Sequence, residues 1–454
     1  MIKYLSIFVF LTTSCLCMAK DVNTQMIVKI NSDNTYITET GNRSSTSGSY
    51  VPDQLKRLAD AVEDNLYNNI VPFWLNYSLD TINGGFFGIV DNVGKGNPEA
   101  SKGLILNSRI LWTFSSLLMQ KDDKLLRNVA DRAYQYLNTC FIDTVYGGAY
   151  YTVDRNGNCL ADQKNTYANA FLIYGLTEYY RATGHQTALE QAKAIFICLE
   201  KYAHDSMYGG YNEIFQRDWS SVPAGTKNDI GNAEKTMNTS LHVMEAFANL
   251  YRVWKLPLLA ERLQEMITIM LEKIINPQTH RQYYFFKRDW SSTVDVKSYG
   301  HDIECSWLLL ESAEILGDES LIQLAKKASI AMAESTLEAL LPDGRIIYES
   351  VDGKPSVSLQ WWAQAEAIVG YVNAWELTGD EQWLTRASSV WSFTEKNFVD
   401  HEYGEWFWGL GNDGKIAKDV PRISAWKCPY HNGRMCMEVM RRYKTHGDIP
   451  VYKH

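Results

Sequence analysis

Three of the nine histidines in this chain stand three or four residues from a second polar side chain, inside stretches with helical spacing. Residues at these distances share one face of a helix, so each pair presents both side chains together. Several such pairs on separate helices favour a shared functional site over three independent structural histidines. The pairs are Asn238 with His242, His301 with Glu304, and His431 with Arg434.

An imidazole with a near-neutral pKa can both accept and return a proton, which suits histidine pairs to reversible acid/base chemistry. Two imidazoles on opposite walls of a ring could remove the proton beside a carbonyl group and return a proton to the far side of the planar enediolate. Arg109, from an earlier helix, could stabilise the negative enediolate oxygen. The pattern favours an epimerase, although Glu304 and Glu366 leave open a hydrolase that uses two carboxylates.

The same residues predict neither a metal nor another cofactor. The chain contains no HExxH motif, and the three histidines fall on separate predicted helices. Arg109 and Arg434 would also place positive charge beside any bound cation. The six cysteines beyond the first twenty residues include no CxxC pair, so they do not indicate a metal site either.

Composition predicts a folded protein that does not bind nucleic acid. Hydrophobic residues make up 46% and aromatic residues 13% of the 454 positions, which is enough to build a large core. The formal net charge is -9, so the chain lacks the broad positive surface that nucleic acids require. We expect a small-molecule substrate, while the oligomeric state is not predicted.

A glycine phrase recurs along the chain and divides it into six units. The glycine pairs that begin at Gly84, Gly147 and Gly209 are 63 and 62 positions apart. Weaker forms of the phrase follow at 281–286, 343–346 and 403–408. Each phrase joins glycine turn chemistry to alternating aromatic residues, which is typical of a short β-hairpin.

The stretches between the phrases have helical spacing and fall into two classes. One class mixes aromatic and polar residues, at 106–119, 166–182, 237–254, 302–316, 361–377 and 432–443. The other has an ordinary amphipathic stripe, at 52–75, 123–137, 187–202, 257–275, 320–338 and 381–397.

These repeats predict an all-α fold in which six helical hairpins close into a ring. The mixed helices would line the inside and the amphipathic helices the outside, with short β-hairpins in the loops on one face. An open solenoid is the competing geometry. It is disfavoured because a solenoid usually ends in a polar cap, whereas the sixth unit is among the most aromatic.

The beginning of the chain reads as an export segment. Lys3 precedes an apolar stretch at 4–11 and then small residues, which predicts a signal peptide over 1–19. Lipid attachment at Cys15 or Cys17 is an alternative to plain cleavage, because the lipobox is imperfect. A polar tether would cover 20–50, and one barrel domain 51–445. The protein would be periplasmic or lipid-anchored to the bacterial envelope, with no other membrane contact.

Read as strings, the polar clusters resemble the cellobiose 2-epimerase family, which belongs with the N-acylglucosamine 2-epimerases. The matching strings are NSRILW at 107–112, HVMEAFANLYRVW at 242–254, GHDIE at 300–304, WW with QAEA at 361–367, and WKCPYHNGR at 426–434. The resemblance implies an (α/α)6 barrel. It also implies that glucose and mannose are interconverted at the reducing end of a β-1,4-linked disaccharide, without hydrolysis or cofactor.

The resemblance implies catalytic roles for five residues. His301 and His431 look like the acid/base pair at C2, and which imidazole acts in which direction is left open. His242 would assist opening and closing of the sugar ring, and Glu304 would support the proton relay. Arg109 looks like the residue that stabilises the enediolate.

A second group resembles the family's sugar-binding residues. Tyr167, Asn238 and Glu366 would contact the sugar, while Trp362 and Trp426 would stack on its rings. The export segment departs from the family pattern, so the natural disaccharide stays open between cellobiose and 1,4-mannobiose. Other open readings are an N-acylglucosamine 2-epimerase, an aldose–ketose isomerase, a glycoside hydrolase or lyase, and a non-catalytic sugar-binding lipoprotein.

Overall fold

The computed structural model divides the chain into two units, Met1–Gly48 and Ser49–His454. In the first unit, β1 (Val28–Ile30) pairs antiparallel with β2 (Tyr36–Thr38). The predicted signal peptide over 1–19 and most of the predicted tether lie outside the described residues. A search of the described helices finds none with the length and apolar content of a membrane span. The structure describes residues 28–30, 36–38, 51–223, 233–292 and 296–447.

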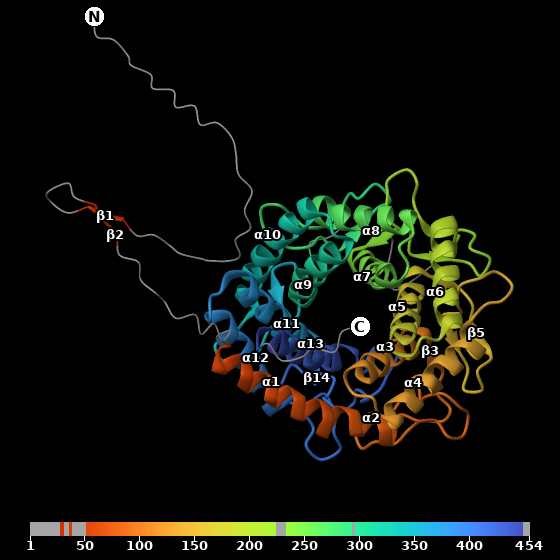
Figure 1. Cartoon of the computed structure of the whole chain (residues 1–454). Coiled ribbons are helices and arrows are strands. Elements are labelled where there is room, and N and C mark those ends of the chain that lie inside the picture. Colours follow the sequence, from red (N-terminus) through yellow and green to blue (C-terminus); the bar gives the residue numbers. More distant parts are fainter. Residues whose placement is uncertain (1–27, 31–35, 39–50, 224–232, 293–295, 448–454) are drawn as a thin grey trace, which may run out of the picture. The chain divides into compact units, whose positions relative to one another are not determined.

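In the second unit, helices alternate between an inner and an outer ring (Figure 1). The inner helices are α3 (Leu104–Gln120), α5 (Thr166–Thr183), α7 (Met237–Val253), α9 (Tyr299–Leu316), α11 (Trp361–Thr378) and α13 (Tyr430–His446). The outer helices are α1 (Asp53–Asn65) with α2 (Val71–Tyr77), α4 (Lys124–Tyr136), α6 (Gln186–Cys198), α8 (Pro257–Ile269), α10 (Glu319–Ser335) and α12 (Gln382–Asn397). The predicted (α/α)6 barrel is confirmed.

The burial of each helix explains its place in the ring. In α3 every residue from Leu104 to Leu118 is buried, and the polar ones face other inner helices or the centre. The outer helix α4 instead buries one stripe that includes Leu126 and Val129. Left-handed glycines end three inner helices and turn the chain back toward the outer ring, where only glycine adopts this backbone without strain. They are Gly184, Gly317 and Gly379.

Four outer helices contain a single π-helical turn that the sequence did not predict. The turn at Leu66–Ile70 joins α1 to α2, and those at Leu137–Phe141, Leu199–Ala203 and Met270–Ile274 end α4, α6 and α8. Each turn buries both its first and its last residue. The wider turn therefore keeps two apolar side chains in the core.

Hydrogen bonds between the first and the sixth helical repeat close the ring. The indole nitrogen of Trp74 donates to Glu405 Oε2 at 2.5 Å. In return, the indole nitrogen of Trp406 donates to Asn65 Oδ1 at 2.9 Å. All four residues are buried. Closure excludes the open solenoid.

Short antiparallel strands fix the ends of the inner helices. The strand before an inner helix pairs with the strand that follows the glycine phrase of the next repeat. These pairs link neighbouring repeats, and other strand pairs form hairpins within one repeat. The linking pairs are β3 (Lys102–Gly103) with β4 (Thr152–Val153), β6 (Lys164–Asn165) with β7 (Ile214–Phe215), β8 (Lys235–Thr236) with β9 (Phe285–Phe286), β10 (Val296–Lys297) with β11 (Ser350–Val351), and β13 (Leu359–Gln360) with β14 (Gly409–Leu410). The hairpins predicted at the glycine phrases are present as single bridges, such as Ile142 with Ala149 and His204 with Tyr211. Two further hairpins lie beyond the phrases, β4 with β5 (Cys159–Ala161) and β11 with β12 (Lys354–Pro355).

Candidate active site

A cavity of about 330 Å³ lies where the inner helices begin. Nine of the ten predicted site residues line it, and the tenth, Glu366, lies directly behind His431. The partly positive N-terminal ends of the inner helices surround this cavity, which favours negative charge inside it. The nine lining residues are Arg109, Tyr167, Asn238, His242, His301, Glu304, Trp362, Trp426 and His431.

His431, in the first turn of α13, is held by a carboxylate. Its Nδ1 lies 2.7 Å from Glu366 Oε1. Burial, followed by the nearby charges of Arg109 and Arg434, holds the pKa of His431 well below its usual range. The neutral ring therefore donates its Nδ1–H to Glu366 and keeps Nε2 available as a proton acceptor.

His242, in the second turn of α7, has the same arrangement with a different carboxylate. Its Nδ1 lies 2.8 Å from Glu245 Oε2, three residues along the helix. Burial raises the pKa of Glu245, but Arg434 and His242 outweigh burial and bring that pKa down to about 2. Tyr430 also donates its hydroxyl to Glu245 at 2.7 Å. Glu245 is therefore an ionised group that orients His242.

Arg434 lies beneath the cavity, behind the histidines, and joins three buried carboxylates. One guanidinium nitrogen donates to Glu245 Oε1 at 2.6 Å. The other donates to Glu304 Oε1 at 2.6 Å and to Glu366 Oε1 at 2.7 Å. Burial and the neighbouring Glu366 raise the pKa of Glu304 to about 8, so this carboxyl carries a proton at neutral pH. The network can store one proton next to the imidazoles.

His301, in the first turn of α9, has a hydroxyl partner. Its Nδ1 lies 2.6 Å from Ser298 Oγ. Burial comes first among the causes that lower the pKa of His301 to about 3, followed by His242, His431 and Arg109. At neutral pH this ring is uncharged.

The two imidazoles expected to act at C2 come from different walls. His301 is on α9 and His431 on α13, with α11 between them, so they are not diametrically opposite in the ring. The indole of Trp362, from α11, packs close to both, with ring centroids 4.6 Å from His301 and 5.7 Å from His431. A sugar ring held in this cavity can therefore meet both imidazoles.

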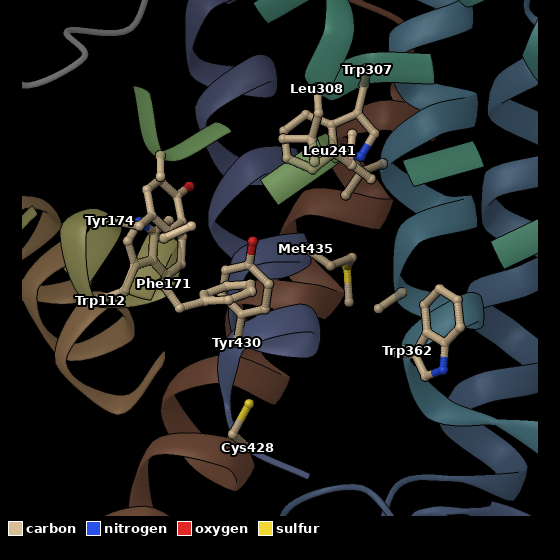
Figure 2. Close-up of a cluster of buried hydrophobic side chains, with 14 of the residues drawn as sticks. Trp112, Phe171, Tyr174, Leu241, Trp307, Leu308, Trp362, Cys428, Tyr430 and Met435 are labelled. Atoms are coloured by element: carbon tan, nitrogen blue, oxygen red, sulfur yellow. The ribbon is translucent and has the colours of Figure 1, made fainter. Parts of the chain in front are cut away.

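Arg109 is held rigidly at the cavity wall by aromatic neighbours. Its guanidinium donates to the Tyr167 hydroxyl at 2.7 Å and lies 4.2 Å from the ring centre of Phe171 and 4.9 Å from that of Tyr430. Figure 2 shows Phe171 and Tyr430 side by side in the buried aromatic cluster, next to Trp112. Such a fixed cation can stabilise a developing oxyanion without moving.

A comparison with known protein families identifies the family of the chain. Residues 85–432 match the family model for N-acylglucosamine 2-epimerase (GlcNAc 2-epimerase). The chain belongs to this epimerase family.

Several relatives in the epimerase family are similar over nearly their whole length. A cellobiose 2-epimerase from Bacteroides fragilis is 39% identical over 84% of this chain and 98% of its own. A cellobiose 2-epimerase from Dictyoglomus turgidum is 36% identical over 86% of this chain and 99% of its own. The resemblance predicted from the sequence strings is confirmed.

Solved structures of epimerases have the same fold as this chain. A sugar epimerase from a ruminal bacterium superposes with a TM-score of 0.81 at 36% identity, covering 85% of this chain and 99% of its own. Cellobiose 2-epimerase from Bacillus thermoamylovorans gives a TM-score of 0.80 at 37% identity, covering 85% and 100%.

Three side chains of this epimerase site could coordinate a cation, but the guanidinium of Arg434 already pairs with the two carboxylates among them. Glu304, Glu366 and His431 place ligand atoms within 4.8 Å of one another. Arg434 donates to both carboxylates, so a metal ion would have to displace the guanidinium. The donor set therefore fits a proton relay better than a metal site.

A second cavity of about 750 Å³ lies where the inner helices end, and none of the histidines predicted to be catalytic lines it. Trp112 and Trp307, which share the inner helices with the site, line this second cavity rather than the first. Trp307 still supports the epimerase site from behind, because its indole donates to Glu366 Oε2 at 3.1 Å. Glu245 and Arg434 also line this second cavity. Arg434 and its three carboxylate partners therefore lie between the two cavities.

Proposed function

We propose that this protein is a cofactor-independent 2-epimerase that interconverts glucose and mannose at the reducing end of a β-1,4-linked disaccharide. The observation that carries the proposal is the pair of uncharged imidazoles, His301 and His431, both packed close to Trp362 in one cavity. The relatives named cellobiose 2-epimerases support the activity and favour cellobiose as the substrate.

In the proposed reaction, His242 assists opening of the sugar ring, because its Nδ1 is bound to Glu245 and its Nε2 is left to exchange a proton with the ring oxygen. One of the two C2 imidazoles then takes the C2 proton at Nε2. The electron pair of the broken C–H bond forms the enediolate, whose negative oxygen is stabilised by Arg109 and the helix N-termini.

The second C2 imidazole takes the proton stored on Glu304 and delivers it to the opposite face of C2, where a new C–H bond forms, and ring closure completes the epimerisation. The first imidazole then gives the proton from C2 to Glu304, so each cycle leaves the enzyme unchanged. Glu304 can serve as this store because its pKa is about 8 and it shares Arg434 with Glu366.

The mouth of the cavity supports binding of a second sugar unit. Trp426 is 41% exposed there and lies 5.9 Å from the ring of Tyr167, centroid to centroid. Aromatic faces stack on sugar rings, and the open position of Trp426 leaves one face available. Asn238 adds a buried side-chain oxygen that has no hydrogen-bond partner within the described part of the chain. A substrate hydroxyl would satisfy it.

The test is incubation with cellobiose, and in parallel with 1,4-mannobiose, in heavy water. We expect deuterium at C2 of both the epimer and the recovered substrate, and little effect of EDTA. His301→Ala and His431→Ala should abolish conversion, whereas His401→Ala, at an exposed histidine, should leave it unchanged. A ketose as the main product, or released monosaccharide, would reject the proposal in favour of an isomerase or a hydrolase.

We also propose that the protein is exported to the periplasm or the envelope surface. The support is the Lys3-led apolar segment at 4–11 followed by Cys15 and Cys17. Mass spectrometry of the mature protein from cells tests this. Loss of about the first nineteen residues indicates plain cleavage, a lipid on a new N-terminal cysteine indicates anchoring, and an intact Met1 contradicts export.

A further inference from the structure

Ser298 occupies the N-cap position of α9 without capping the helix. At this position a serine oxygen ordinarily accepts a hydrogen bond from an amide of the first turn. Two other inner helices, α5 and α7, follow that rule, because Asn165 accepts from Ala168 N at 2.8 Å and Thr236 accepts from Thr239 N at 3.0 Å. Among the described residues, the Ser298 side chain makes no such cap bond.

The Ser298 hydroxyl is used instead on a catalytic imidazole. Its Oγ lies 2.6 Å from His301 Nδ1, and the serine is buried and lines the cavity. A cap bond of this kind ordinarily stabilises the helix that it begins. Its diversion toward His301 indicates that the contact with the ring has a role beyond helix stability.

The two C2 imidazoles thus have unequal partners at Nδ1. His431 faces the carboxylate of Glu366, whereas His301 faces a neutral hydroxyl. A carboxylate stabilises an imidazolium far more than a hydroxyl does, because it adds an opposite charge to the hydrogen bond. The same neutral ring is therefore a stronger base at His431 than at His301.

The other charged and titratable groups disfavour a charged ring at both positions, so the contrast between the two rings rests on their Nδ1 partners. His242 from α7 and Arg109 from α3 act on both rings, His431 from α13 acts on His301, and Arg434 acts on His431. Glu304 lies one turn along α9, where Arg434 binds it. The loops that line the cavity add Tyr284, whose ring lies 5.6 Å from His301, and also Tyr348 and Glu349.

We propose that Ser298 is a positioning residue that makes the two acid/base imidazoles unequal, with His301 the stronger acid and His431 the stronger base at C2. This inference rests on the proposed function. Of the two imidazoles, His431 then takes up a proton more readily, and His301 is the neutral partner. Ser298 and Glu366 therefore control different limbs of the pH–rate profile.

The test compares pH profiles of kcat/KM for epimerisation by the wild type, Ser298→Asp and Glu366→Gln. The acid limb reports protonation of the weaker base, so Ser298→Asp should move it upward by about one pH unit or more and leave the basic limb in place. Glu366→Gln should lower the basic limb instead. Both substrate directions must give the same profile, because the equilibrium constant fixes the ratio of their kcat/KM values.

An active Ser298→Asp enzyme with an unmoved acid limb, or with a shifted basic limb, would overturn the inference. If this variant does not fold, Ser298→Ala and Ser298→Thr decide the matter. We expect Ser298→Ala to lower kcat about tenfold or more with KM nearly unchanged, and Ser298→Thr to restore most of the rate. Full activity of Ser298→Ala would reject the role.

A histidine NMR titration separates this inference from the proposed function. The His301 titration midpoint should rise by about one pH unit or more in Ser298→Asp relative to the wild type, with or without turnover. If the wild type epimerises no β-1,4-linked disaccharide but the midpoint still rises in Ser298→Asp, only the proposed function is rejected. If the His301 midpoint is unchanged in a folded, active Ser298→Asp enzyme, only the role of Ser298 is rejected.

Discussion

At the scale of single residues, the site depends on how Arg434 compensates three buried carboxylates. Each of its partners, Glu245, Glu304 and Glu366, is almost fully buried. A buried charge without a partner costs several kcal/mol, so one guanidinium cannot keep three carboxylates ionised at the same time. The raised pKa of Glu304 is the physical outcome, because a proton on this carboxyl removes the excess charge.

Glu366→Gln tests how far catalysis depends on this network. The amide keeps the shape of the side chain but removes the charge that stabilises the His431 imidazolium. We expect kcat to fall about 10²- to 10³-fold with the fold intact, as measured by steady-state kinetics and circular dichroism. Glu213→Gln is the matched control, since Glu213 is also buried but bonds only Thr236 and Thr239 outside the cavity. Equal losses in both variants would contradict the assignment.

His301 makes a testable contribution to the dependence of stability on pH. Its pKa falls from 6.5 to about 3 on folding, so below pH 6.5 the unfolded chain binds a proton that the folded protein rejects. Stability from this group is complete above pH 6.5 and is lost as the pH falls toward 3, by at most about 1.4 kcal/mol per pH unit.

Urea unfolding of His301→Gln between pH 7 and 5 measures this contribution. The variant should lose less stability on acidification than the wild type. His401→Gln, at an exposed histidine, should follow the wild type. Parallel curves for wild type and His301→Gln would show that the imidazole is not held neutral.

The sequence predicted the identity of the site residues better than their partners. Helical spacing and the family strings together placed nine of ten residues on one cavity and the tenth directly behind it. Glu245 was missed although it stands three residues after His242, a spacing that could have revealed it. Ser298 carried no usable signal, because a serine before a helix predicts a cap.

At the scale of elements, periodicity located the helices well but did not reveal the π-helical turns of the outer ring. The inner and outer helices begin and end within a few residues of the predicted ranges, since each has a clear buried face. The π-helical turns were not predicted, because a change from one hydrogen-bond register to the next leaves the apolar pattern almost unchanged. The strand pairs between units depend on long-range pairing that local spacing does not encode.

The glycine phrases should be sensitive to a single methyl group. Gly148 has a left-handed φ of 68°, and an added Cβ would lie 2.6 Å from the Trp219 ring. Gly148→Ala should therefore destabilise the protein by about 2–4 kcal/mol, from backbone strain and overpacking together. Gly184→Ala is the control, because its φ is 71° but its Cβ would meet nothing within 4 Å. It should cost about 1 kcal/mol, and equal melting temperatures would contradict the clash.

At the scale of the whole molecule, the closed ring should function without the first unit. The family match begins at residue 85, and the second unit contains every predicted site residue. A variant that lacks residues 1–49 should therefore keep kcat and KM within about twofold of the full chain. Steady-state kinetics with cellobiose checks this, with Glu366→Gln in the same background as the inactive reference. A large loss of activity would mean that the predicted tether takes part in catalysis.

The position of α13 has a consequence for synthesis of the protein. This last helix carries His431 and Arg434, and it packs against both α1 and α11. During translation the growing chain can assemble its earlier hairpins, but it cannot join the two ends of the ring until α13 has left the ribosome. Nascent chains and prematurely terminated products therefore have no completed reaction centre, and the cell acquires the activity only with the finished polypeptide.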